Sequence, residues 1–223
     1  MSFTPSILPL GEGAWTVALG DRVDRALHRE VIGLAQQIAA ADLPGVLEIV
    51  PAYAAVTVFF DPGSAVADGL RDSLAALVGR SRDSDAILPT GEQPSRARLV
   101  TIPVRYDGPD LDAVSRDTGL SRDEVIGRHS APEYRVYLLG FAPGFAYLGD
   151  LDPALFLPRR GTPRTRVPAG SVAMAGAQTA VYPLATPGGW HLIGSTSVLM
   201  FDPAREPAAL LEPGDRVRFE PLP

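Results

Sequence analysis

The spacing of apolar residues divides the chain into an early part of alternating strands and helices and a later part of short strands. In the early part, strands are predicted at 15–19, 46–50 and 55–60, and the last has Val56, Val58 and Phe60 on one side. Three strands of this kind need helices to cover their apolar face, so the segments between them decide the fold.

Two amphipathic helices are predicted around these strands. The first has Asp21 as its N-cap residue. Its apolar residues recur at helical spacing and are Val23, Leu27, Val31, Leu34 and Ile38. The second helix carries Val66, Leu70, Leu74 and Leu77. Two helices interleaved with a few strands predict a small α/β sandwich.

Composition changes between 79 and 98, where a mixed-charge run is followed by a turn-rich segment. Such a stretch is typical of a solvated linker between domains. We therefore predict an N-terminal α/β sandwich domain at 1–84 and a second domain at 85–223.

The second domain is predicted to begin with a strand at 99–104 and two helices, at 111–118 and at 122–129. Ser121 and Glu124 form a capping-box pattern at the start of the second helix. Short strands broken by Gly and Pro follow, at 134–139, 171–174, 180–182, 191–194, 198–201 and 216–219. This pattern favours a closed or partly closed β-barrel, so the fold class is α+β.

Composition and charge narrow the class of protein. The chain has no cysteine, which excludes disulfides and thiolate chemistry. A net charge of −6 disfavours nucleic acid and anionic membrane as partners. The longest apolar stretch, 52–60, is too short to span a bilayer, and residues 1–10 lack a signal-peptide pattern. We expect a cytoplasmic protein with no nucleic-acid or membrane partner.

No common motif of a self-contained active site is present. The sequence has no G-x-x-x-x-G-K-[ST], G-x-G-x-x-G, H-E-x-x-H or G-x-S-x-G pattern. Its three histidines, His28, His129 and His191, do not share metal-ligand spacing, so no metal site is expected. His129 lies near a predicted helix C-terminus, where the helix dipole stabilises a cation, and is interpreted as structural.

A Gly-rich and aromatic run at 139–149 is the first candidate for a binding pocket. Glycines let a backbone approach a ligand, and aromatic rings line pockets. The pocket-wall candidates here are Phe141, Pro143, Gly144 and Phe145. A tight hairpin whose aromatic residues fill a barrel core explains the same pattern, and both interpretations stay open.

A second candidate is the Arg-rich loop at 158–170, which has four arginines within eight positions. Guanidinium groups bind carboxylate or phosphate through paired hydrogen bonds, so the loop is an anion-binding candidate. A solvated loop with surface ion pairs is the alternative. Further along, Gln178, Tyr182 and His191 offer polar groups. Gly188, Gly189 and Trp190 are further pocket-wall candidates, although Trp190 also suits a core anchor.

Several blocks of sequence, in order, resemble one known family. They are Leu139-Gly140-Phe141-Ala142-Pro143-Gly144-Phe145, Thr162-Pro163-Arg164-x-Arg166-Val167-Pro168-Ala169-Gly170, Gly176-x-Gln178-Thr179, Pro187-Gly188-Gly189-Trp190 and Pro213-Gly214-Asp215-Arg216-Val217. The chain resembles the family of 5-oxoprolinase B subunits, also called the Kip-inhibitor or allophanate hydrolase subunit 1 (carboxyltransferase domain C) family.

The resemblance implies a cyclophilin-like β-barrel after the N-terminal domain. It also implies an enzyme subunit, inactive alone, that works with a sister carboxyltransferase-like protein (the C subunit, or allophanate hydrolase subunit 2) and a lactam-opening subunit. Together these convert 5-oxoproline to glutamate with ATP, which is shared between subunits and accompanied by Mg²⁺. The chain has no lysine and therefore carries no biotin itself. A carboxyltransferase subunit of the allophanate or urea carboxylase type, and an inhibitor of a sensor histidine kinase, are the alternatives.

Within that resemblance, Arg164 and Arg166 are expected to hold a phosphate or carboxylate. Gln178, Tyr182 and His191 are expected to orient the amide substrate beside them. No residue is assigned a catalytic role.

Overall fold

The computed structural model describes residues 3–63, 67–83 and 97–223. Its contacts separate the chain into two compact units, Met1–Ser95 and Arg96–Pro223. The predicted domain boundary, between 84 and 85, lies outside the described residues. No helix in the described ranges is both long enough and apolar enough to cross a membrane.

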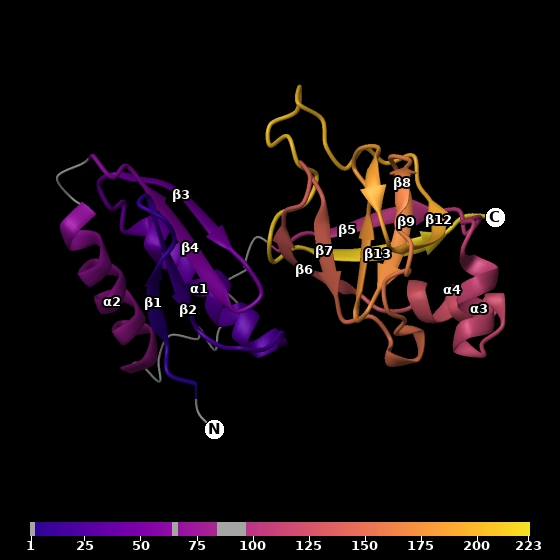
Figure 1. Cartoon of the computed structure of the whole chain (residues 1–223), viewed down its shortest axis with the longest axis horizontal. Coiled ribbons are helices and arrows are strands. Elements are labelled where there is room, and N and C mark those ends of the chain that lie inside the picture. Colours follow the sequence, from indigo (N-terminus) through magenta and orange to yellow (C-terminus); the bar gives the residue numbers. More distant parts are fainter. Residues whose placement is uncertain (1–2, 64–66, 84–96) are drawn as a thin grey trace. The chain divides into compact units, whose positions relative to one another are not determined.

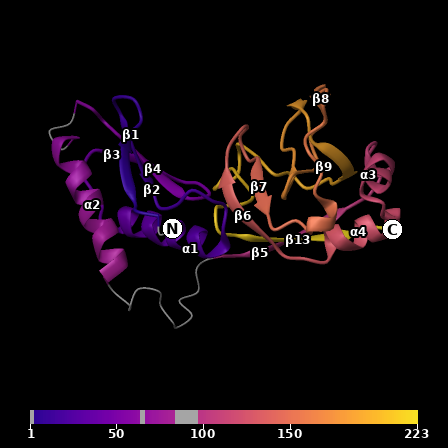
Figure 2. The same ribbon diagram turned by 60° about the horizontal axis from the view of Figure 1, so that its bottom comes forward.

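The first unit is a four-stranded antiparallel sheet with two helices (Figure 1). Its elements are β1 (Ser6–Pro9), β2 (Ala14–Ala18), α1 (Arg25–Ala40), β3 (Val46–Pro51), β4 (Ala55–Phe60) and α2 (Ala67–Asp83), with strand order β1-β2-β4-β3. One core contains Val56, Val58 and Phe60 from one face of β4 together with the apolar faces of α1 and α2. Figure 2 shows both helices against this sheet.

Helix α1 begins later than the sequence pattern predicts. Its N-cap residue is Asp24, not Asp21, and the Asp24 carboxylate accepts hydrogen bonds from Ala26 N and Leu27 N at 2.9 and 3.0 Å. Val23 consequently precedes the helix and is 59% exposed. Aspartate at either position suits an N-cap. Asp24 has an extended backbone, and its side chain satisfies two of the helix's free N–H groups. Val66 of the second predicted helix face lies outside the described residues.

The second unit is a seven-stranded sheet with a two-stranded ribbon and two short helices. The sheet order is β12-β9-β10-β7-β6-β13-β5, and the ribbon pairs β11 with β8. The elements are β5 (Leu99–Val104), α3 (Leu111–Thr118), α4 (Arg122–Ser130), β6 (Tyr134–Leu139), β7 (Ala146–Gly149), a 3₁₀ turn (Pro153–Leu155), β8 (Arg164–Val167), β9 (Ser171–Ala175), β10 (Gln178–Val181), β11 (Thr186–Gly188), β12 (His191–Ser195) and β13 (Arg216–Pro221).

Backbone hydrogen bonds join the two edges of the seven-stranded sheet. Arg105, just after β5, and Ser195, at the end of β12, exchange N–H···O bonds of 2.9 and 2.8 Å. Two more bonds, from Gly108 N to Ile193 O and from Asp110 N to Leu192 O, extend this seam. The sheet is thereby nearly closed into a barrel, as the sequence predicts, and its interior is a continuous apolar core.

Helices α3 and α4 lie beside one another on the same side of the barrel in both views (Figures 1 and 2). Gly119 ends α3 in the left-handed conformation, with φ +73°. The capping box predicted at Ser121 and Glu124 is confirmed, because the Ser121 hydroxyl accepts from Glu124 N and the Glu124 carboxylate accepts from Ser121 N. These helices bring the chain from β5 to β6 with their termini satisfied.

Several strand predictions differ from the structure. The strand predicted at 198–201 is wrong, since this segment forms only an isolated bridge between Phe201 and Ala209. Strands β1, β7, β8 and β11 were not predicted. The ribbon β8–β11 matters most for function because it carries two residues of the Arg-rich loop, Arg164 and Arg166, against the outside of the barrel.

Candidate anion-binding site

Asp110 is the centre of a buried polar cluster where the barrel seam meets the Arg-rich loop. Its Oδ1 accepts hydrogen bonds from Arg160 Nη1 and Arg164 Nη2, both at 2.7 Å. Its Oδ2 accepts from the backbone N–H of Leu192 in β12, also at 2.7 Å. Asp110 directly precedes α3, yet its side chain makes no cap bond to that helix and turns to the arginines instead. One carboxylate therefore fixes two guanidinium groups.

The electrostatics of this cluster keep Asp110 ionised. The carboxylate is only 4% exposed, and burial by itself raises its pKa. The hydrogen bonds from Arg164 and from Leu192 N, together with the positive charges of Arg164 and Arg160, outweigh burial and hold the pKa below its ordinary value. Two cations consequently share one permanent anion.

The backbone around the arginines is fixed by the ribbon and by the segment before β12. Arg164 pairs with Gly188 across the ribbon, and Arg160 N donates to Gly189 O at 2.8 Å. His191 Nε2 donates to the Pro158 carbonyl oxygen at 2.9 Å. The predicted residues Arg164, Gly188, Gly189 and His191 are therefore brought together in one place.

Some polar atoms of this cluster have no hydrogen-bond partner among the described residues. They are buried and comprise Arg160 Nε, Arg164 Nη1, Thr186 Oγ1 and His191 Nδ1. Buried polar groups are usually paired, so four of them around one ribbon call for an explanation. The side chains of Arg160 and Arg164 are 32% and 25% exposed, so other atoms of each arginine face solvent while these two nitrogen atoms do not.

Tyr182 lies against the same ribbon from the barrel side. A β-carbon added at Gly188 would come within 2.3 Å of the Tyr182 hydroxyl oxygen, so any larger residue here would force the Tyr182 ring to shift. Burial raises the pKa of the Tyr182 hydroxyl, and a hydrogen bond from the Trp190 backbone and the charge of Arg159 oppose that rise only in part. Tyr182 is thus a neutral hydroxyl beside the arginines.

The aromatic candidates form a cluster between the ribbon and the outside of the barrel. Phe145 is its centre, with ring centroids 5.3 Å from Tyr182 and 5.8 Å from Trp190. Phe145 and Trp190 are buried, whereas Pro143 is exposed and Gly144 buried. Phe141 is 62% exposed and has φ +70°, an unusual conformation for a residue with a side chain. Phe141 therefore lies at the surface edge of the cluster, and the pocket-wall role of these residues stays a prediction.

Two predicted residues lie away from the Asp110 cluster. Arg166 is exposed on β8, and it makes no hydrogen bond or ion pair with any described residue. Gln178 begins β10, where it pairs with Ala175 and Gly149 and is half-buried. The side-chain hydrogen bonds of Asp110 go to Arg160, Arg164 and Leu192 N, not to Arg166 or Gln178, so the structure does not bring all five predicted substrate residues to Asp110.

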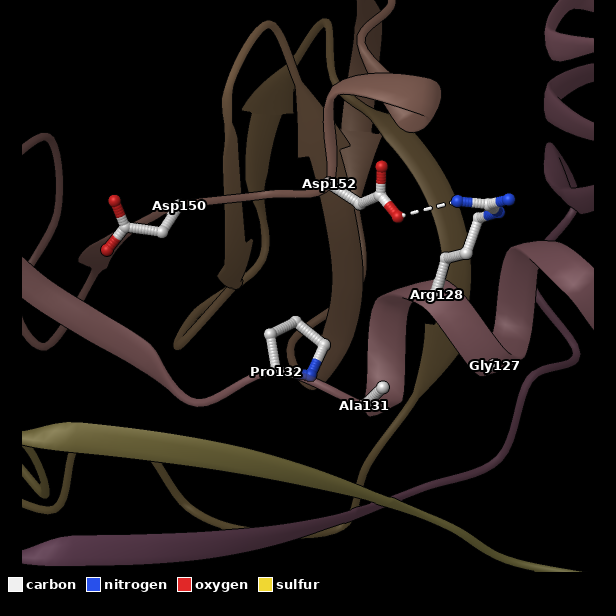
Figure 3. Close-up of a pocket in the computed structure, with 6 residues that line it drawn as sticks. All are labelled: Gly127, Arg128, Ala131, Pro132, Asp150 and Asp152. Carbon is white, nitrogen blue, oxygen red and sulfur yellow. Dashed lines mark hydrogen bonds and ion pairs between the residues drawn. The ribbon is translucent and has the colours of Figure 1, made fainter.

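A surface pocket of about 420 Å³ lies elsewhere on the second unit (Figure 3). It is lined by Gly127, Arg128, Ala131, Pro132, Asp150 and Asp152. Arg128 Nη1 contacts Asp152 Oδ2 at 2.9 Å across it. None of the sequence-predicted site residues lines this pocket. In the described ranges, no group of three or more His, Cys, Asp or Glu could hold a metal ion.

Comparison with known proteins places the chain in a family. Residues 5–211 match the sequence profile of the family described as carboxyltransferase domain, subdomain C and D. The chain is also 44% identical over 215 residues to the 5-oxoprolinase B subunit of Escherichia coli O157:H7, covering 95% of this chain and 94% of that protein. The chain belongs to this carboxyltransferase-domain family.

Solved structures of other proteins share the fold. TTHA0988 is 43% identical, superposes with a TM-score of 0.81 and matches 94% of this chain. The chain spans 40% of the length of TTHA0988, so that relative contains more polypeptide than this chain. Kluyveromyces lactis urea carboxylase, 19% identical, has a TM-score of 0.73 and matches 98% of this chain and 22% of its own. The predicted α+β fold class and the predicted family are confirmed.

Sequence reasoning missed two residues of the cluster, Asp110 and Arg160. Arg160 belongs to the Arg-rich loop, and the clustering of arginines could have included it. Asp110 precedes a predicted helix, where an acidic residue is ordinarily read as a cap. Its arginine partners are 50 and 54 positions further along, and no local pattern links them.

Proposed function

We propose that this family member is a subunit of an ATP-dependent 5-oxoprolinase. It would act with a sister carboxyltransferase-like subunit and a lactam-opening subunit to convert 5-oxoproline to glutamate. The observation that carries the proposal is the 44% identity, over almost the whole of both chains, to a protein named as the B subunit of 5-oxoprolinase. Identity at that level along the full length favours a shared role over a shared fold alone.

The chemistry of the Asp110 cluster is compatible with this reaction. A lactam is a stable amide, and transfer of a phosphoryl group to its oxygen would supply a leaving group. Such a transfer requires the substrate to be held in place, and fixed cationic donors can hold an anionic substrate. Arg160 and Arg164 are held rigidly by Asp110, with the neutral Tyr182 hydroxyl and His191 close to the same ribbon.

The proposal assigns ATP binding to the assembly rather than to this chain alone. The sequence contains no phosphate-binding loop of the G-x-x-x-x-G-K-[ST] type and no lysine. The nucleotide, with an accompanying Mg²⁺, would be shared with partner subunits, and no biotin would be attached to this chain. A site completed by a partner would also explain why buried donors here lack hydrogen-bond partners among the described residues.

The test is phosphate release from ATP, with and without 5-oxoproline. It is measured for this chain alone, with the sister subunit, and with the lactam-opening subunit added. We expect 5-oxoproline-dependent release only from the complete mixture, and a fall of roughly tenfold or more when Arg164→Ala replaces the wild-type chain. Equal release with and without this chain would refute the proposal.

A second candidate is a carboxyltransferase subunit of the allophanate or urea carboxylase type. It is favoured by the family's description as a carboxyltransferase domain. Under this hypothesis the complete mixture shows no 5-oxoproline-dependent phosphate release. The chain still binds its sister subunit, and the pair acts on a urea derivative. Failure to bind any sister subunit would instead favour a regulatory binding protein that inhibits a sensor histidine kinase.

A further inference from the structure

The Asp110 cluster carries an unbalanced charge. Arg160 and Arg164 both place a guanidinium nitrogen 2.7 Å from the same oxygen, Asp110 Oδ1. Among the residues that the structure describes, neither arginine has another acidic partner. Two positive charges and one negative charge leave a net charge of +1 in a partly buried site. An isolated charge in such a site is unfavourable unless an anion compensates it.

The cluster also retains unused hydrogen-bond donors. Arg160 Nε and Arg164 Nη1 are buried and have no partner within the described ranges. A guanidinium group has five N–H donors, so each arginine can hold Asp110 and a second anion together. These two nitrogen atoms are themselves buried, whereas 32% of the Arg160 side chain and 25% of the Arg164 side chain is exposed, so a second anion would approach through the exposed part of each side chain.

We propose that Arg160 and Arg164 together bind the single carboxylate of the amide substrate, with Asp110 as the positioning residue that orients both guanidinium groups. This inference rests on the proposed function for the identity of the substrate, which is 5-oxoproline, a monocarboxylate. It replaces the pair Arg164 and Arg166, expected from the sequence, with the pair that the structure brings together.

The charge of the cluster favours a carboxylate over a phosphate group. One carboxylate brings the net charge from +1 to zero, whereas a phosphate dianion leaves an excess negative charge near Asp110. Asp110 therefore repels multiply charged anions while it fixes the arginines. Planar guanidinium groups also match the planar, two-oxygen geometry of a carboxylate.

The experiment measures steady-state kinetics of the complete three-subunit mixture with Arg160→Gln or Arg164→Gln in this chain. Each variant removes one charged donor, so the KM for 5-oxoproline should rise about tenfold or more, while the KM for ATP changes less than about twofold. The control is Arg159→Gln, because Arg159 is exposed and lies 6.0 Å from the Trp190 ring centroid rather than at Asp110. Thermal unfolding confirms that each variant is folded.

The outcomes separate this inference from the proposed function. Turnover of 5-oxoproline with unchanged KM values in both variants, or a rise confined to the KM for ATP, would overturn the inference and leave the function standing. A complete mixture that does not turn over 5-oxoproline would refute the proposed function. In that case, calorimetric titration of 5-oxoproline and acetate into the mixture decides the inference. Binding of either acid that is lost with Arg160→Gln but kept with Arg159→Gln supports the inference. Binding of neither acid to the wild-type mixture overturns it.

The positioning role of Asp110 is tested separately, by the inhibition of the Asp110→Asn variant by sulfate. Asp110→Asn removes the negative charge and leaves two arginines to attract anions, so sulfate should become a competitive inhibitor against 5-oxoproline. We expect its inhibition constant to fall about tenfold relative to wild type. A purely structural role for Asp110 would lower activity without changing the preference for anions. Unchanged sulfate inhibition in a folded Asp110→Asn variant contradicts the positioning role.

Discussion

At the scale of single residues, His129 shows how burial overrides a local expectation. A histidine in the last turn of a helix is stabilised as a cation by the helix dipole. Here the ring is fully buried and stacks on Phe219 with centroids 4.7 Å apart. Thr179 Oγ1 donates to Ala173 O, so His129 Nε2 donates to Thr179 and His129 Nδ1 accepts from Tyr106. The ring is therefore a neutral member of the barrel core.

This state predicts a pH dependence of stability. Burial lowers the pKa of His129 from 6.5 to about 3. Below pH 6.5 the unfolded chain takes up a proton at this position and the folded chain does not, so stability is lost as the pH falls from 6.5 towards 3. The slope approaches about 1.4 kcal/mol per pH unit. Urea unfolding at a series of pH values should show it.

The matched comparison is His129→Gln, which cannot take up a proton. We expect this variant to be less stable at pH 7, because Gln does not reproduce the ring stacking, and to lose this share of the pH dependence. Wild type and variant with the same slope between pH 6.5 and pH 4.5 would show that His129 is already charged in the folded protein.

At the scale of elements, the seam between the end of β5 and β12 is the structural support of the candidate site. Gly108 lies in this seam, and a β-carbon there would fall 2.3 Å from both the Ile193 carbonyl carbon and the Leu192 carbonyl oxygen. Backbone atoms cannot move away as the end of a flexible side chain can. The close approach holds Asp110 beside Leu192, so the seam and the arginine cluster depend on each other.

Gly108→Ala should therefore destabilise the barrel by about 2–4 kcal/mol, through strain in the seam. Gly127→Ala is the control, since a β-carbon at this helical glycine of α4 meets no other atom within 4 Å. That variant should be neutral or more stable by about 0.5–1 kcal/mol. Thermal and urea unfolding measure both, and equal stability of the two variants would show that the seam is not tightly packed.

Much of the element pattern could be predicted because local signals agreed with the final fold. Helix α3 and the strand at 134–139 have the predicted bounds, since periodicity and Gly or Ser signals mark their ends. The ribbon was missed because Gly, Pro and Arg dominate 158–170 and 183–190, and such residues are ordinarily read as loop. The ribbon forms by packing on the outside of the barrel, with Val167 in the aromatic core, which no local pattern reveals.

The candidate site was predictable to a lesser degree than the fold. The Arg-rich loop and His191 stood out by composition, and the structure brings Arg164 and His191 close together. Asp110 could not be found, because its role depends on barrel closure that places Leu192 N beside it. Arg166 alternates with Thr165 on β8 just as Arg164 does, so sequence spacing could not distinguish an arginine in the cluster from an exposed one.

At the scale of the whole molecule, a site with excess positive charge, and with donors that have no partner in the described part of the chain, fits a protein that works with other subunits. TTHA0988 is more than twice as long as the part that this chain matches, which shows that this fold occurs joined to further polypeptide. In the proposed complex, partner subunits would supply the phosphate-binding groups that this chain, which has no phosphate-binding loop and no lysine, does not offer.

In the proposed function, this chain is required for opening 5-oxoproline. The most direct measurement is the formation of labelled glutamate from labelled 5-oxoproline and ATP, in the complete mixture and in the mixture lacking only this chain. Glutamate should form in the complete mixture, fall to background when the chain is omitted, and form again when the chain is added back. Glutamate formed at the same rate without this chain would contradict the proposed function.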